Sequence, residues 1–211
     1  MDGPFDHISF MRLLSTSSCN TPAEALPTRL VAARGDSPPV VIDLLTNKLV
    51  WSGKNANDTS IGLCSKFSTV SLLSLSDRIF AAGDVGGKLR FYDIVTQRKP
   101  VYEFPVYEVF TLTNNYTGTS GMGCKRPISQ LATSFDGSTL FLGDTYGTVI
   151  GLDIRKLMAS NSLIVPDAKL ATKTHTDFCR KLLPMISGLK GIMGSVRGIH
   201  ATESNILVVS A

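Results

Sequence analysis

Acidic and glycine residues recur in this sequence at a spacing that could bring carboxylates together. Gly83 and Asp84 are followed by Gly87 and then by Asp93, with two and five residues between them. The same spacing returns at a second set of positions: Gly143, Asp144, Gly147 and Asp153. Carboxylates can act as general acids, bases or metal ligands. Because the last aspartate recurs once per repeat, as Asp43, Asp93 and Asp153, we instead expect these three to accept hydrogen bonds from backbone amides and hold turns.

Other reactive side chains lack the arrangements that catalysis and cofactor binding need. Residues 118–125 look like a phosphate-binding loop, but Cys124 interrupts the required pattern. His175 and Cys179 would share one face of a helix, yet structural zinc takes four ligands. No spacing suggests a nucleophile beside a base and an orienting group. We therefore predict no enzyme activity, no cofactor and no metal site.

Basic residues are concentrated in one stretch of a chain whose formal net charge is +4. From Lys169 to Arg197 there are six basic residues and one acid. Within this stretch, Lys190 and Arg197 flank glycines whose backbone amides stay reachable. This composition suits contacts with phosphate or with an acidic partner. A solvated loop whose glycines serve only tight turns explains the same residues equally well.

Two further pairs of basic residues follow the last aspartate of successive repeats. A position that recurs after each repeat falls in an equivalent loop, so both pairs should lie on one face of the molecule. Such repetition on one face is what a binding surface requires. The pairs are Arg98 with Lys99 and Arg155 with Lys156.

The repeats are predicted to be β-hairpins. Residues 78–95 and 139–155 each contain apolar residues that alternate with others along two runs, so that one face can be buried. A tight turn joins the runs, and Gly87 and Gly147 lie where it needs a positive φ. Two weaker copies are residues 28–45, with Gly35, Asp36 and Asp43, and residues 205–211.

A complete unit would add one strand before each hairpin and one after it. Strand-like segments precede the hairpins at 7–14, 127–138 and 195–204. Four antiparallel strands per unit are typical of a β-propeller blade. We therefore predict an all-β fold in which an incomplete propeller occupies the whole chain. Its blade-like units are residues 7–60, 66–115, 127–165 and 195–211, with a basic insertion at 166–194.

Composition places the chain among globular, intracellular proteins. Hydrophobic residues make up 43% and charged residues 18%, which is too apolar for a disordered chain. The start has no basic segment followed by an apolar run, so we expect no secretory signal. No apolar stretch reaches the ~18 residues of a membrane-spanning helix. Four scattered cysteines without a C-x-x-C pair indicate a reducing compartment.

The repeats resemble WD repeats, although their hallmark residues are degenerate. The run from 128 to 153 carries the likeness most fully, with Gly143-Asp-Thr-Tyr-Gly147 near its end. The tryptophan that usually precedes the last aspartate is replaced by Ile42, Tyr92 and Leu152 in the three copies. The usual Gly-His dipeptide is missing as well.

From about residue 75 to residue 211, the chain resembles the family of WD repeat-containing protein 74, also called the NOP seven-associated protein family. The segments that carry this resemblance are Arg98-Lys-Pro-Val101, Leu152-Asp-Ile-Arg155 and above all Leu189-Lys-Gly-Ile-Met-Gly-Ser-Val-Arg-Gly-Ile199. The resemblance implies a seven-bladed ring, of which this chain would supply about three blades and part of a fourth.

The resemblance also implies a function. It predicts a non-enzymatic scaffold in the assembly of the large ribosomal subunit, located in the nucleolus and nucleus. Its partners would be assembly factors, an AAA-type remodelling ATPase and precursor rRNA, with no membrane and no small-molecule substrate. A WD-repeat interaction platform of another pathway, such as a ubiquitin-ligase adaptor or a signalling protein, is an alternative. A more distant one is a propeller-fold hydrolase, which would need a cluster of acids at the central channel.

Overall fold

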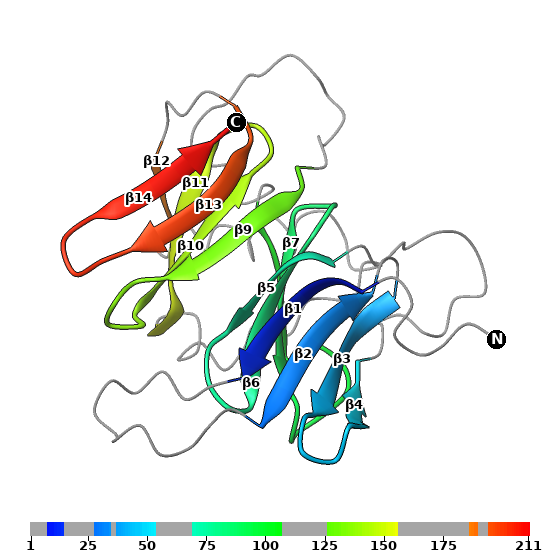
Figure 1. Cartoon of the computed structure of the whole chain (residues 1–211). Coiled ribbons are helices and arrows are strands. Elements are labelled where there is room, and N and C mark those ends of the chain that lie inside the picture. Colours follow the sequence, from blue (N-terminus) through cyan, green and yellow to red (C-terminus); the bar gives the residue numbers. More distant parts are fainter. Residues whose placement is uncertain are drawn as a thin grey trace, which may run out of the picture.

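In the part of the chain that this computed structural model describes, the fold consists of three four-stranded antiparallel sheets and one two-stranded sheet (Figure 1). The structure describes residues 8–14, 28–34, 37–53, 69–106, 126–155, 186–189 and 194–211. All fourteen elements within these ranges are strands. Strands that follow one another along the chain are hydrogen-bonded neighbours, so each sheet is a simple meander. The prediction of an all-β fold is confirmed.

The strands fall into four groups in chain order. The first sheet contains β1 (Ile8–Leu14), β2 (Arg29–Arg34), β3 (Ser37–Asp43) and β4 (Lys48–Ser52). The second contains β5 (Thr69–Ser74), β6 (Ile79–Asp84), β7 (Lys88–Asp93) and β8 (Tyr102–Pro105). The third contains β9 (Ile128–Thr133), β10 (Thr139–Asp144), β11 (Val149–Asp153) and β12 (Ile186–Leu189). The fourth contains β13 (Val196–Ala201) and β14 (Ile206–Ser210).

The hairpin predicted for each of the two clear repeats is present. β6 pairs with β7, and β10 pairs with β11, in antiparallel register. Gly87 and Gly147 lie in the connecting turns with φ of 78° and 80°. Glycine adopts this left-handed conformation without the steric cost that a Cβ atom would bring. The weaker copy also forms a hairpin, of β2 and β3, although Gly35 and Asp36 lie outside the described residues.

The fourth strand of the third sheet comes from the segment predicted to be a basic insertion. β12 lies within residues 166–194 and pairs antiparallel with β11, so the third sheet extends to Leu189. The predicted limit of that unit at residue 165 is therefore wrong. Four residues, Ile-Ser-Gly-Leu, are too short an alternation to be recognised as a strand from sequence.

The second sheet is buried on both faces. Phe80 and Ala82 of β6 pack with the first sheet, whereas Ala81 between them packs with the third. In β7, Tyr92 packs with the first sheet and Phe91 with the third. All five side chains are at most 3% exposed. The sequence pattern predicts one buried face, but both are buried because the sheets stack face against face.

The first strands of consecutive sheets lie in a row. β1 contacts β5, β5 contacts β9 and β9 contacts β13, and Figure 1 shows β1, β5 and β9 side by side. Each first strand shifts its pairing register around its second residue, which makes a β-bulge there. The bulged residues are Ser9, Val70, Ser129 and Arg197. An irregularity at the same place in each sheet indicates that the sheets are copies of one unit.

Gly83 and Gly143 occupy matching places at successive boundaries between sheets. A Cβ atom built on Gly83 would lie 2.8 Å from the Cβ atom of Ile128, the first residue of β9. A Cβ atom built on Gly143 would lie 2.8 Å from the Cβ atom of Val196, the first residue of β13. Neither place admits a methyl group, so each glycine lets the next sheet approach closely.

Serine hydroxyl groups join the same sheets. Ser71 donates a hydrogen bond from its Oγ to the carbonyl oxygen of Ile128 at 2.6 Å. Ser129 donates one to the carbonyl oxygen of Val196 at 2.7 Å. Ser129 is the bulged residue of β9, and Ser71 follows the bulge of β5. The two boundaries therefore share a close glycine contact and a serine hydrogen bond.

Candidate binding surface

The repeated aspartates at the ends of β6 and β10 hold the tight turns. Oδ1 of Asp84 accepts a hydrogen bond from the backbone N–H of Lys88 at 2.8 Å. Oδ1 of Asp144 accepts two, from the backbone N–H groups of Tyr146 and Thr148, at 2.8 and 2.7 Å. Asp84 is only 7% exposed and Asp144 is fully buried. Both carboxylates are committed to their own turns, which leaves them poorly placed to meet a substrate.

An ion-pair network extends from Asp84 across β7 to β8. Nη1 of Arg90 lies 2.7 Å from Oδ2 of Asp84, and its Nε lies 2.8 Å from Oε2 of Glu103. Nζ of Lys88 lies 2.7 Å from Oε1 of Glu103. Burial would raise the pKa of Glu103, but the charges of Arg90 and Lys88 outweigh it and lower the pKa below its ordinary value. The charges of this network therefore satisfy one another within the second sheet.

The third sheet pairs its aspartate with an arginine from a different place. Arg126 precedes β9, and its Nη1 lies 3.4 Å from Oδ2 of Asp144 and donates to Oγ1 of Thr148 at 3.2 Å. Its guanidinium carbon lies 5.2 Å from the ring centre of Tyr146, a cation–π contact. An aspartate–arginine pair thus recurs at the turn, although the arginines come from non-equivalent positions and cannot be aligned by spacing.

The last aspartate of each repeat lies at the opposite end of the sheets. Oδ1 of Asp43 accepts hydrogen bonds from two backbone N–H groups that follow it, at 3.0 and 2.8 Å. Asp93 accepts one at 3.0 Å and also pairs with Arg78. Burial would raise the pKa of Asp93, but the hydrogen bond and charge of Arg78 help to lower it. Oδ1 of Asp153 lies 4.0 Å from Nε of Arg155.

Three of the basic residues selected from the sequence lie at this same end. Asp93 pairs with the first residue of β6, and Asp153 pairs with the first residue of β10. The segments that follow these aspartates therefore begin at equivalent positions, at the same end of the two sheets. The three basic residues are Arg98, Lys99 and Arg155, and all three are exposed.

Arg197 lies at the other end of the sheets. It is exposed and follows Val196, which packs on Gly143 at the far end of β10. A strand of six residues spans roughly 20 Å, so one small ligand cannot contact Arg197 and Arg155 together. Lys156 and Lys190 lie outside the described residues.

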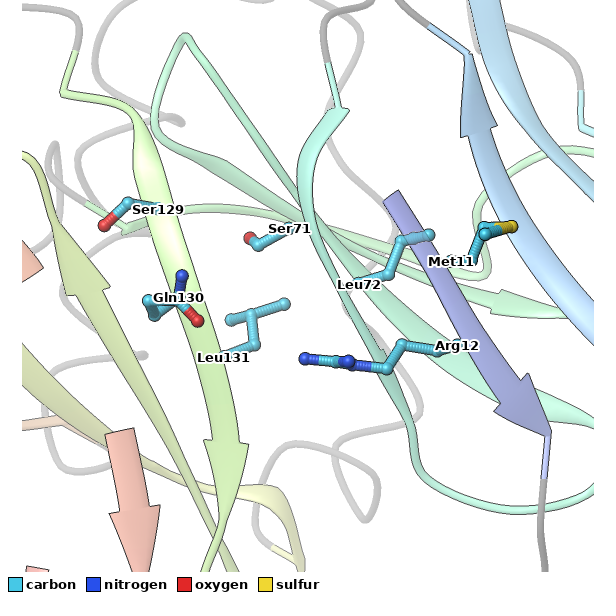
Figure 2. A pocket seen from close by; sticks show the side chains of 7 residues that line it. All are labelled: Met11, Arg12, Ser71, Leu72, Ser129, Gln130 and Leu131. Atoms are coloured by element: carbon cyan, nitrogen blue, oxygen red, sulfur yellow. The ribbon is translucent and has the colours of Figure 1, made fainter. Parts of the chain in front are cut away.

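A hollow of about 70 Å³ lies on the row of first strands, between β1, β5 and β9. Figure 2 shows Arg12 extending from β1 past β5 toward Leu131 of β9, with Gln130 next to it along that strand. Apolar and polar side chains share the lining, which includes Arg12, Ser71, Leu72, Ser129, Gln130 and Leu131.

Arg12 and Gln130 are the polar groups of this hollow with unused hydrogen-bonding capacity. Within the described part of the chain, no hydrogen bond or ion pair involves either side chain. Ser71 and Ser129 already donate to backbone carbonyl groups. Sequence reasoning missed Arg12, yet a signal exists, because Arg12 is a lone charge in the otherwise uncharged strand β1.

Among the described residues, no three His, Cys, Asp or Glu side chains are grouped so that they could hold a metal ion. In those same ranges, no helix has the length and apolar character needed to cross a membrane. Neither the protein-family models nor the curated proteins that were searched include a match to this sequence.

Proposed function

We propose that this chain is part of a WD-type β-propeller that acts as a non-enzymatic binding scaffold. The observation that carries the proposal is the repeated boundary between sheets. At two successive boundaries, a glycine of the second strand lies against the first residue of the next sheet, whose carbonyl group accepts a serine hydrogen bond. Units that meet through the same contacts are related by similar rotations, so they stack around an axis as propeller blades do.

The distribution of polar groups supports a binding function. The repeated carboxylates stabilise turns or form ion pairs. The apolar side chains of the second sheet are buried against the neighbouring sheets. The features left for a partner are exposed basic loops at one end, Arg197 at the other, and the hollow beside Arg12. Function in such folds resides in sites of this kind rather than in the fold itself.

The pathway that we propose is assembly of the large ribosomal subunit, in the nucleolus and nucleus. Its support is the resemblance of residues 75–211 to the family of WD repeat-containing protein 74. The string that resembles the family most, residues 189–199, runs from the end of β12 into β13. Arg197 therefore lies at the start of the next unit, in β13, whereas Lys190 lies outside the described residues. The proposed partners are assembly factors, an AAA-type remodelling ATPase and precursor rRNA.

Affinity purification from cells that express a tagged chain tests this proposal. We expect large-subunit precursor proteins and precursor rRNA in the eluate, and a nucleolar signal by microscopy. A Gly143→Val variant, which obstructs the boundary with β13, should lose these partners and serves as the matched control. Recovery of only ubiquitin-ligase or signalling subunits would instead assign the scaffold to another pathway.

A further inference from the structure

We propose that the hollow between β1, β5 and β9 binds the carboxylate of an acidic side chain presented by a partner protein, with Arg12 and Gln130 as its hydrogen-bond donors. The inference concerns a site that the proposed function does not assign. It also holds for a scaffold of any pathway, because it depends only on the geometry of the first three sheets.

The donors of the hollow are available and face a space of suitable size. Arg12 is exposed, and neither it nor Gln130 has a hydrogen-bond or ion-pair partner within the described ranges. A guanidinium can donate two parallel hydrogen bonds to one carboxylate, and the carboxamide of Gln130 can add a third. The hollow measures about 70 Å³, whereas a single water needs only about 10–15 Å³. A carboxylate with its neighbouring methylene group therefore fits.

The sign of the charge along the first strands favours an anionic ligand. The described strands β1, β5, β9 and β13 contain Arg12, Arg197 and His200 but no aspartate or glutamate. A carboxylate that enters the hollow thus meets no acidic side chain on these four strands. Ser129 links the two arginine-bearing regions, because it lines the hollow and bonds the carbonyl group of Val196.

The lining favours a protein side chain over a nucleic-acid phosphate. Leu72 and Leu131 form part of the wall, and they can contact the methylene groups of glutamate or its apolar neighbours. Binding of a phosphate backbone relies on several cations spread along the strand. The hollow offers one arginine, which matches a single carboxylate.

An array of acetylated and amidated nonapeptides tests the inference, with each sequence present in a glutamate form and a glutamine form. The purified chain is applied to the array, and dissociation constants of the best pairs are measured by fluorescence anisotropy. We expect the glutamate form to bind about tenfold more tightly than its glutamine twin, because the lost bond is a charge-assisted one. Amidation ensures that only the side-chain carboxylate is offered.

Three variants of the lining and one control variant identify the donors. Arg12→Gln should weaken the binding of glutamate peptides about tenfold and leave the binding of glutamine peptides unchanged. Arg12→Lys should keep part of the preference for glutamate over glutamine. Lys48→Gln removes an exposed cation from β4, the strand of the first sheet farthest from β1, and should change nothing. Near-ultraviolet circular dichroism verifies that each variant is folded. Gln130→Leu tests the second donor and should weaken the binding of the same glutamate peptides by a smaller factor.

The inference is overturned if no peptide prefers its glutamate form or if Arg12→Gln binds as well as the parent chain. It is equally overturned if a single-stranded RNA oligonucleotide binds in an Arg12-dependent manner while the peptides do not, which would assign the hollow to phosphate. The peptide measurements use purified chain alone. A failure here therefore leaves the pathway proposal standing, and the absence of ribosomal partners in cells leaves the carboxylate site standing.

Discussion

The indole of Trp51 meets the ring of Tyr92 edge to face across the boundary between the first two sheets, with ring centres 5.6 Å apart. Phe80 contacts both rings: it stacks on Tyr92 with ring centres 5.1 Å apart, and it meets Trp51 edge to face with ring centres 5.7 Å apart. Nε1 of Trp51 donates a hydrogen bond to the carbonyl oxygen of Gln97 at 3.3 Å. The outermost strand of one sheet is thereby tied to a loop of the next, and the three rings form the centre of the first interface.

Replacement of Tyr92 by phenylalanine should stabilise the protein. The hydroxyl group of Tyr92 is buried and finds no hydrogen-bond partner among the described residues, and burial is the main cause that raises its pKa. An unsatisfied buried hydroxyl costs about 1–3 kcal/mol, and Tyr92→Phe removes it while the ring contacts remain. Urea unfolding followed by circular dichroism should show a gain of about 1 kcal/mol. A loss of stability would mean that the hydroxyl group is satisfied after all.

Addition of a methyl group to Gly83 or Gly143 should destabilise the boundaries between sheets. The new Cβ atom would lie 2.7 Å from Cγ2 of Ile128 in Gly83→Ala and 2.5 Å from Cγ1 of Val196 in Gly143→Ala. Overpacking of this kind costs about 1–3 kcal/mol. Gly198→Ala is the matched control, since its nearest contact would be an ordinary 3.7 Å. Equal melting temperatures for all three variants would contradict the close approach.

Loss of the Glu103 carboxylate should make stability less dependent on pH. Its pKa is lowered in the folded state by Arg90 and Lys88 against the opposing effect of burial. A group with a lowered folded pKa stabilises the protein above its ordinary value of 4.5, and the contribution disappears as pH falls through the folded value. We expect Glu103→Gln to cost about 3 kcal/mol at pH ~7, because Arg90 loses a buried partner.

The same comparison at low pH checks the origin of that loss. As the pH falls below 4.5 and through the lowered folded pKa of Glu103, protonation of the carboxylate should bring the parent chain closer to the variant, so that the difference in unfolding free energy shrinks. Glu203→Gln is a control, because Glu203 is exposed. A difference that stays constant over this range would point to packing rather than charge.

Under the proposed contact with precursor rRNA, the two groups of basic residues should contribute to binding independently. Arg98, Lys99 and Arg155 lie at one end of the sheets and Arg197 at the other, farther apart than the Debye length of about 8 Å. Charge reversal of Lys190 with Arg197 should weaken co-sedimentation with precursor particles. Reversal of Arg98, Lys99 and Arg155 to glutamate should cause a separate loss of co-sedimentation. The slope of log affinity against log salt concentration should fall by about one unit for each phosphate contact that is lost. Unchanged sedimentation would remove rRNA contact from the proposal.

The hairpins could be predicted from sequence because their information is local. Gly87 and Gly147 mark turns whose positive φ is a property of two or three residues, and the alternation around them defines the strands. The burial of β6 on both faces could also have been predicted from its sequence. Its contiguous apolar residues, Phe80 to Ala82, are typical of a strand that is covered on both faces.

The features that escaped prediction depend on contacts between distant segments. β12 is recognisable only by its pairing with β11, since its own four residues carry no repeat pattern. Arg12 borders a hollow whose other walls come from β5 and β9, far along the chain. Arg90 and Arg126 pair with equivalent aspartates from non-equivalent positions. No spacing rule expresses such relationships, because they exist only after the sheets have stacked.

The bulge at the second residue of every first strand has a consequence for how such a fold can diversify. The bulged residue stands outside the regular ladder, so its side chain is not fixed by a cross-strand neighbour. Ser9, Val70, Ser129 and Arg197 differ in size, polarity and charge although they occupy one backbone geometry. Apart from Ser129, whose hydroxyl group joins two sheets, this position of the first strands can therefore change its residue type from repeat to repeat without altering the framework.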